Sequence, residues 1–216
     1  MIAYWYFVIS MFMVSYRFWK GAQMSEVLTL LTSATAHPLV KSFGGADVIQ
    51  RPFSTGKLFN VSEEPVSDLQ SLSALLLRLE GDPTHTVIRG SLTEGQNNPV
   101  PRNKEIFIAT PRQWCMIDID SLSWDGDLSD QQAMVSYAIQ QLPVEFQAAG
   151  CWYHFSFIMG IKAGINVHLW FWLERTCSDN ELKTWISGCA VDMRMFNPIQ
   201  IHLTANPQFS DGAVDP

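Results

Sequence analysis

The stretch Gln113-Trp-Cys-Met-Ile-Asp-Ile-Asp120 determines how we interpret the rest of the chain. It is an apolar run that ends in two acids separated by one residue. Side chains two residues apart on a strand share a face, so Asp118 and Asp120 would project together from the strand end. Two close carboxylates repel each other unless a cation lies between them, and cations such as Mg²⁺ take oxygen ligands. The alternative is a strand that simply ends in water.

The segments that follow predict the order strand, helix, strand, strand, helix, strand. This order is the split βαβ, or ferredoxin-like, arrangement. We therefore expect an α+β fold in which residues 113–216 form a ferredoxin-like, RRM-like βαββαβ catalytic unit. The expected strands are 113–120, 151–158, 167–173 and 199–204, and the expected helices are 133–142 and 178–187.

Capping boxes mark the start of both expected helices. In this motif a Ser or Thr is followed three residues later by Glu or Gln, and each side chain bonds to the other's backbone N–H. Ser129 with Gln132 and Ser178 with Glu181 have this spacing. Pro143 would end the first helix, because proline cannot donate a backbone hydrogen bond.

For residues 24–112 we expect a smaller N-terminal α/β module, which packs on the face of the sheet that the two helices leave open. Leucines at near-helical spacing predict a helix over 67–80, which ends before Gly81. The other expected elements are a short helix over 26–31, a strand over 84–90 and a polar loop over 91–104.

Residues 1–23 form an apolar leader in which Arg17 and Lys20 follow the apolar run. A signal peptide has its positive charge before the apolar run. A membrane span takes roughly 20 apolar residues, so this run is short for one. We expect Met24 to be the natural start of the domain, with a short membrane segment as the alternative.

Composition restricts the classes of function. The chain has 216 residues, of which 47% are hydrophobic and 16% charged, as in a folded globular protein. Its net charge of −7 argues against a protein that binds nucleic acid through bulk positive potential. Residues 114–216 carry twelve Asp or Glu against four Lys or Arg, and metal ions would neutralise part of this charge. The four cysteines lack paired zinc spacing, which predicts free thiols in a reducing, cytoplasmic setting.

Side-chain alternation tests the expected sheet. Every expected strand has one wholly apolar face, which would pack under the two helices. In a ferredoxin-like sheet, strand 167–173 lies antiparallel beside strand 113–120, and strand 199–204 lies on the other side of 113–120. The polar faces of these strands would then point away from the helices.

This arrangement brings distant polar residues to one edge of the sheet. Asp118 and Asp120 would neighbour His168, and Asp192 would enter at the same edge. Such convergence is not expected of a strand that merely ends in water. Trp170 lies on the same face and needs a cover, which the N-terminal module could provide to form a cleft.

Three short motifs occur in a fixed order in this part of the chain. They are Ile117-Asp118-Ile119-Asp120, Asn166-Val167-His168 and Val191-Asp192. In sequence and order they resemble the motifs of the archaeo-eukaryotic primase superfamily, including its primase-polymerase branch. The resemblance covers roughly residues 113–207, and within it the stretch Gln200-Ile-His-Leu-Thr-Ala-Asn-Pro207 is similar to replication proteins of mobile elements and phages. Asn166 departs from the family pattern, in which a serine or another small residue is usual.

The resemblance implies template-directed nucleotidyl transfer from NTPs or dNTPs, as a DNA primase or primase-polymerase. It implies that Asp118, Asp120 and Asp192 are the catalytic acids and hold two divalent cations, Mg²⁺ or Mn²⁺. The implied partners are a single-stranded DNA template, nucleoside triphosphates, and a replicative helicase or a fused C-terminal module. A membrane partner is not expected. Because such proteins often continue into further modules, a chain that ends at Pro216 would be a fragment.

Nucleotide-binding residues are also implied. His168 would contact the incoming triphosphate, with Lys162 as a second phosphate contact. Ser156 could donate a hydroxyl to the nucleotide. For Lys162 and Ser156 a purely structural role is an equal alternative. For His154, which lies on an expected strand, we expect a satisfied core residue.

Two other classes of function remain as alternatives. A non-catalytic RRM-like nucleic-acid-binding module would use aromatic stacking and a basic surround, and would have no need of Asp192. A palm-like nucleotide cyclase also uses acids on strands and two metals, but gives no reason for His168. Labelled triphosphates with a single-stranded template would distinguish the three classes by their products.

Overall fold

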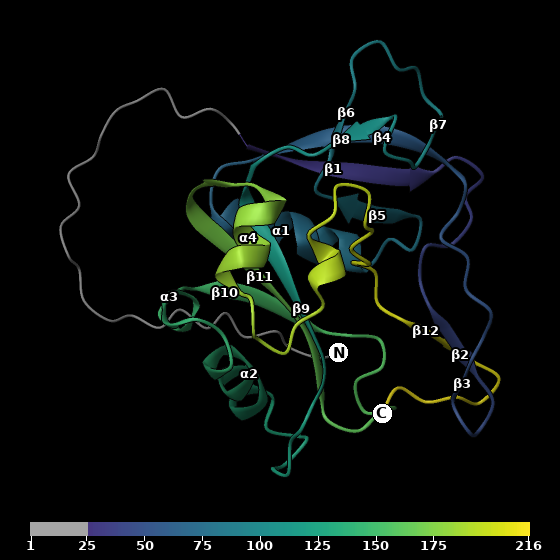
Figure 1. Ribbon diagram of the computed structural model, residues 1–216. Coiled ribbons are helices and arrows are strands. Elements are labelled where there is room, and N and C mark those ends of the chain that lie inside the picture. Colours follow the sequence, from purple (N-terminus) through teal and green to yellow (C-terminus); the bar gives the residue numbers. More distant parts are fainter. Residues whose placement is uncertain (1–25) are drawn as a thin grey trace.

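The computed structural model describes residues 26–216, so the leader predicted over residues 1–23 lies outside the described part of the chain. The described residues have the predicted α+β fold, with four α-helices and two main antiparallel sheets (Figure 1). We call the sheet with strand order β5-β1-β4-β7 the N-terminal sheet. We call the sheet with strand order β10-β11-β9 the central sheet.

The N-terminal sheet corrects one prediction. Residues 26–31 are not a helix but belong to strand β1 (Glu26–Ser33), which pairs with a strand on each side. Both edges of β1 are therefore paired, and a short apolar run of this kind cannot be distinguished from a helix by periodicity alone. The other strands of this sheet are β4 (Leu58–Val66), β5 (His85–Ile88) and β7 (Val100–Pro101).

The helix predicted over 67–80 is confirmed as α1 (Leu69–Glu80). It begins at Asp68, whose carboxylate accepts a hydrogen bond of 2.7 Å from the backbone N–H of Ser71. The strand predicted over 84–90 is confirmed as β5, whereas the predicted polar loop contains β6 and β7. The short strands outside the two main sheets are β2 (Ser42–Gly44), β3 (Ile49–Gln50), β6 (Ser91–Leu92), β8 (Phe107–Ile108) and β12 (Gln208–Ser210).

The central sheet confirms three of the predicted strands. They are β9 (Arg112–Leu122), β10 (Cys151–Phe155) and β11 (Ile165–Cys177). β11 lies antiparallel beside β9, as predicted, and its register places His168 opposite Asp118. The sheet therefore carries the acidic and histidine motifs on neighbouring strands.

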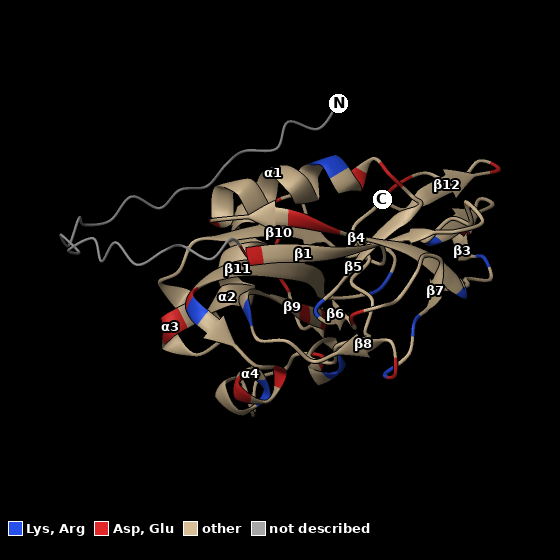
Figure 2. Ribbon diagram, turned by 90° about the horizontal axis from the view of Figure 1, so that it is seen from above, with Lys and Arg blue, Asp and Glu red and all other residues tan. Residues whose placement is uncertain are grey.

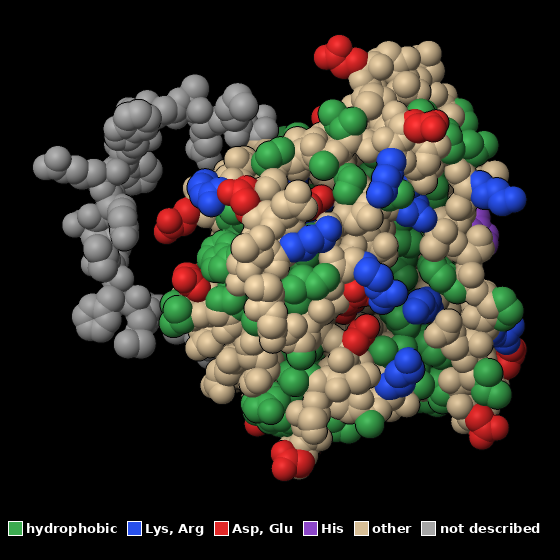
Figure 3. All heavy atoms as spheres, viewed as in Figure 1, with side chains coloured by type: hydrophobic (Ala, Val, Ile, Leu, Met, Phe, Trp, Pro, Cys, Tyr) green, Lys and Arg blue, Asp and Glu red, His purple; other side chains and the backbone are tan. Residues whose placement is uncertain are grey.

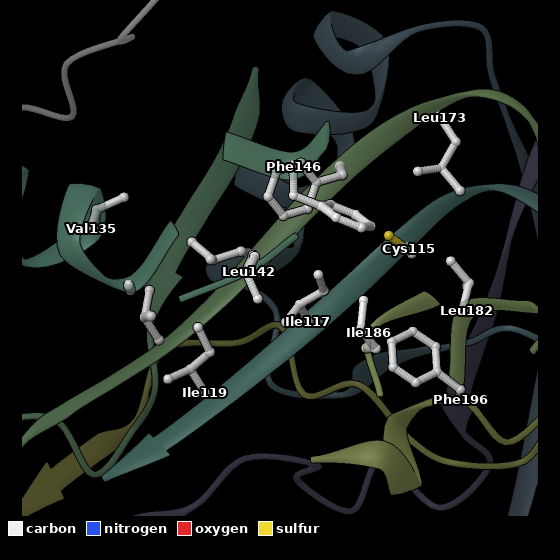
Figure 4. Close-up of a cluster of buried hydrophobic side chains, with 14 of the residues drawn as sticks. Cys115, Ile117, Ile119, Val135, Leu142, Phe146, Leu173, Leu182, Ile186 and Phe196 are labelled. Carbon is white, nitrogen blue, oxygen red and sulfur yellow. The ribbon is translucent and has the colours of Figure 1, made fainter. Parts of the chain in front are cut away.

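One face of the central sheet is apolar, as the alternation predicts. Cys115, Ile117 and Ile119 of β9 join a buried cluster with residues of β11 and of three helices (Figure 4). Each fully buried aliphatic side chain of this kind contributes about 1.5–3 kcal/mol. The helices on this face are α2 (Gln131–Gln140), α3 (Val144–Gln147) and α4 (Asp179–Trp185).

The two predicted helix starts have different outcomes. The capping box at Ser178 and Glu181 is present at the start of α4. The start predicted at Ser129 is wrong, because the carboxylate of Asp130 accepts the hydrogen bond of 3.0 Å from the N–H of Ala133. Since α2 begins at Gln131, Asp130 is the residue in position to bond to the first turn.

The opposite face of the central sheet is covered by the N-terminal part of the chain. Trp114, Met116 and Trp170 are fully buried there, in one cluster with Leu28 of β1 and the leucines of α1. Figure 2 shows α1 and α4 on opposite sides of the strands. The cover that the sequence required over Trp170 is therefore present.

The strand predicted over 199–204 is wrong. Among the described residues, this segment makes an isolated bridge between His202 and Val87 of β5, away from β9. The free edge of β9 is taken instead by Arg89, which donates to the carbonyl of Trp114, and by the N–H of Asp192, 2.9 Å from the carbonyl of Asp118. These groups occupy the backbone acceptors that a fourth strand would need.

The C-terminal segment returns to the N-terminal part, because β12 pairs in parallel with β2. The four cysteines are free thiols, as predicted. Within residues 26–216, none of the helices has the length and apolar character needed to cross a bilayer.

Candidate functional site

Asp118 is a buried acid with an unsatisfied oxygen. Its side chain lies on the same face of β9 as Trp114 and Met116, and the residue is 9% exposed. Oδ1 of Asp118 lies 3.4 Å from Nε2 of His168 but makes no hydrogen bond to any described residue. A buried acceptor without a donor costs roughly 1–3 kcal/mol. This oxygen is therefore suited to an additional ligand.

Asp120 is exposed, yet its surroundings disfavour a negative charge. Desolvation raises the pKa of its carboxyl, and the charges of Asp118 and Asp192 raise it further. His168 and Lys162 act in the opposite direction. The register of β9 and β11 places His168 opposite Asp118, and the N–H of Asp192 bonds to the carbonyl of Asp118, so both groups lie near the end of β9.

Asp192 reaches this point from the segment after α4. Its N–H is bonded to the carbonyl of Asp118, and the residue begins the short 3₁₀ helix η1 (Met193–Met195). Its carboxylate accepts hydrogen bonds from Arg194, at 2.9 Å from Nε to Oδ1 and 2.7 Å from Nη2 to Oδ2. This guanidinium lowers the pKa of the Asp192 carboxyl. Sequence reasoning left Arg194 without a role.

His168 is linked to His154 on the neighbouring strand β10. Nδ1 of His168 lies 2.8 Å from Nε2 of His154, and the rings meet edge to face. Burial lowers the pKa of His154 well below its usual range, and the charge of His168 lowers it further. A neutral His154 fixes one nitrogen of His168 and leaves Nε2 directed at Asp118. The expectation of a satisfied core residue is wrong, because Nδ1 of His154 is buried without a partner among the described residues.

Asn166 holds the turn that follows the acidic pair. Its Oδ1 accepts a hydrogen bond of 2.8 Å from the N–H of Ser121, and its Nδ2 donates to the carbonyl of Gly164 at 3.0 Å. Ser121 has a φ of 55°, which a residue with a side chain rarely adopts. A serine at position 166 is too short to bridge both groups. Ser156 is buried at this point, and its N–H donates to the carbonyl of Asn166 at 2.8 Å.

Two lysines flank the acids. Lys162 is exposed in the turn between β10 and β11. Lys41, which sequence reasoning missed, comes from the N-terminal part; burial lowers the pKa of its ammonium, and the negative charge of Asp120 opposes this shift. Figure 3 shows acidic side chains in the middle of this face with Lys and Arg side chains around them. No motif marks Lys41 in the sequence, because only the tertiary fold brings it to Phe157, more than a hundred residues along the chain.

Two of the three acids are free to bind a divalent cation, and the third is not. Asp118 and Asp120 supply hard oxygen donors, and the first has a buried oxygen without a hydrogen bond. Asp192 can join them only if it releases Arg194. Accordingly, within residues 26–216 no three His, Cys, Asp or Glu side chains stand together as a ready set of metal ligands.

Comparison with known proteins identifies a phage relative. The chain is 28% identical over 207 residues to a protein of Escherichia phage T5 named "Putative replication origin binding protein". The match covers 85% of this chain and 22% of the phage protein, so the chain spans about a fifth of that relative's length. No family model matches the chain, and no solved structure matches it. The chain is thus similar to one segment of a much longer phage protein.

Proposed function

We propose that this chain is a primase or primase-polymerase domain, which performs template-directed nucleotidyl transfer in phage DNA replication. The observation that carries the proposal is the convergence of Asp118, Asp120 and Asp192 beside His168 at the end of β9. The name of the phage T5 relative supports the role in replication. The name says nothing of nucleotidyl transfer, so the acids carry that part of the proposal.

In this proposal the acids bind the cations that the reaction requires. Asp118 and Asp120 would be the first ligands, since their carboxylates lie on one strand face with no Lys or Arg in an ion pair among the described residues. Asp192 would join them by exchanging Arg194 for a cation. The bound ions would activate the attacking 3′-hydroxyl and stabilise the pyrophosphate that leaves.

His168 and Lys162 would hold the triphosphate. His154 orients the ring of His168, so that a nucleotide phosphate meets Nε2 without a rotation of the side chain. Lys162 is exposed, and its charge lowers the pKa of Asp120, so it would supply a positive charge beside the proposed cation site. Ser156 is buried beneath this turn, and its backbone bond to Asn166 supports a structural role over a nucleotide contact.

The experiment is a primer-synthesis assay with labelled NTPs or dNTPs, a single-stranded DNA template and Mg²⁺ or Mn²⁺. We expect the unaltered protein to make oligonucleotides. Asp118→Asn and Asp120→Asn should each reduce the rate on the order of 10³-fold or more, because each removes a ligand charge from the reacting centre. Asp125→Asn is the matched control, since Asp125 is exposed five residues beyond Asp120.

The proposal requires that the variants fail in chemistry and not in folding. All three variants should keep the circular dichroism spectrum and melting temperature of the unaltered protein. Synthesis by Asp118→Asn at the unaltered rate would refute the metal assignment. Cyclic products in place of oligonucleotides would identify a nucleotide cyclase.

A second candidate is a DNA-binding module without catalysis. The name of the phage T5 relative favours it, since that protein is described as binding a replication origin. If the chain is such a module, we expect tight binding of duplex origin DNA, measured by fluorescence anisotropy, and no product in the synthesis assay. In that case Asp118→Asn should leave the DNA affinity unchanged or raise it, because the substitution removes a negative charge.

A further inference from the structure

Lys41 is held at the start of the small sheet that β12, β2 and β3 form. It lies between the buried Val40 and strand β2, and its carbonyl accepts a hydrogen bond of 3.0 Å from the N–H of Gln208. The pairing of β2 with β12 begins at the next residue, Ser42. The backbone of Lys41 is therefore fixed on both sides, and its side chain extends from a defined position.

The ammonium group of Lys41 has an aromatic neighbour but no anionic partner. Nζ lies 3.4 Å from the centre of the Phe157 ring and 5.9 Å from that of Phe53. Lys41 forms no ion pair with any carboxylate of residues 26–216. It is half-buried, and a charged ammonium in such a place is costly unless an anion or aromatic face compensates it.

Phe157 connects this lysine to the acids through a short series of contacts. It follows Ser156, whose N–H is bonded to the carbonyl of Asn166, and the side chain of Asn166 holds the N–H of Ser121. Ser121 is the residue after Asp120. The Lys41 ammonium thus rests on the same turn that fixes the acidic pair.

Charged groups of both signs act on Lys41. Burial lowers the pKa of its ammonium, Asp120 raises it, Lys162 lowers it and Asp118 raises it. Charges of both signs from different parts of the chain therefore act on the Lys41 ammonium, and Figure 3 shows acidic side chains on this face with Lys and Arg side chains around them. A ligand that combines several phosphates with a divalent cation matches this pattern, because the cation meets the acids and the phosphates meet the lysines.

We infer that Lys41 binds a phosphate of the nucleoside triphosphate together with Lys162, so that the N-terminal part of the chain completes the nucleotide site. This inference rests on the proposed function and adds a residue to it. The alternative source of phosphate is the DNA backbone. A nucleotide is favoured because the adjoining acids repel a DNA phosphate that brings no cation of its own.

The test is a calorimetric titration of the full chain with dATP in the presence of Mg²⁺, and separately with inorganic tripolyphosphate. We expect Lys41→Met to weaken dATP binding roughly 10- to 100-fold, the effect of one hydrogen bond to a charged group. Lys41→Arg, which keeps the charge, should retain most of the affinity. The matched control is Lys57→Met, because Lys57 is an exposed lysine of the same part of the chain.

Each outcome has a defined meaning. Loss of affinity for both dATP and tripolyphosphate, with the melting temperature unchanged, would support the inference. Binding of dATP by Lys41→Met at the unaltered affinity would overturn it and leave the proposed function standing. Weakened binding of a single-stranded oligonucleotide with unchanged dATP binding would also overturn it, since the lysine would then serve the DNA. If the unaltered protein made no oligonucleotide in the synthesis assay, the proposed function would fail independently of Lys41.

Discussion

Replacement of Arg89 is expected to destabilise the whole fold. The Arg89 side chain is fully buried, and its Nε donates to the carboxylate of Asp179 at 2.7 Å. It also donates to the carbonyl of Trp114, and its Nη2 donates to the carbonyl of Cys177 at 3.0 Å. One guanidinium thus joins the end of the N-terminal sheet, the edge of β9 and the start of α4.

The magnitude follows from what Arg89→Met leaves behind. Asp179 would remain as a buried carboxylate without a partner, since its Oδ2 already lacks a hydrogen bond to any described residue. Removal of one partner from a buried ion pair costs about 3–5 kcal/mol. Domains of this kind are stable by about 5–15 kcal/mol, so the variant should be close to unfolding.

Urea denaturation followed by tryptophan fluorescence measures the loss, because Trp114 and Trp170 are buried near this pair. The double variant Arg89→Met with Asp179→Asn should regain part of the stability, since the unpaired charge is gone. Arg175→Met is the control, because its ion pair with Glu181 lies at the surface. Its urea midpoint should not change. If Arg89→Met unfolded at the same urea concentration as the unaltered protein, the assigned role of this ion pair would be refuted.

Two further predictions concern stability. Burial raises the pKa of Glu80 to about 7, against an ordinary value of 4.5. The protein should therefore lose stability, by up to about 3 kcal/mol, as the pH rises from the ordinary pKa of the Glu80 carboxyl through its pKa in the folded state. Urea titrations at pH 5 and pH 8 measure this loss, and the loss should be smaller for Glu80→Gln. An equal loss of stability in both proteins would contradict this. Gly164 has a φ of 84°, and a Cβ there would lie 2.5 Å from the carbonyl oxygen of Leu122. Gly164→Ala should cost about 2–3 kcal/mol, whereas Gly188→Ala, with a similar φ but open space, should cost less.

The central sheet could be predicted from the sequence because alternation is a local property. Strand β9 shows one apolar face and one face with Asp118, and a shift of one residue would reverse both, so the register is strongly determined. The capping box before α4 is local as well. The meeting of Asp118 with His168 followed from the antiparallel pairing of two such strands.

Other features required tertiary contacts. Residues 26–31 form a strand because β4 pairs with one edge of this segment and β5 with the other. The segment 199–204 could have paired with β9, but Arg89 and Asp192 already hold the carbonyls of that edge. Hydrogen-bond partners of this kind are separated by long stretches of chain, so no local pattern reveals which one takes an edge.

By itself, the sequence determined the α+β class, the order of the central strands and the presence of an acidic pair beside a histidine. These follow from periodicity and from pairing between strands with strong patterns. Only the tertiary structure decided that Arg194 holds Asp192, that His154 orients His168, and that the Lys41 ammonium lies over the Phe157 ring. The physical reason is that charges act through space, and folding sets their distances independently of their separation along the chain.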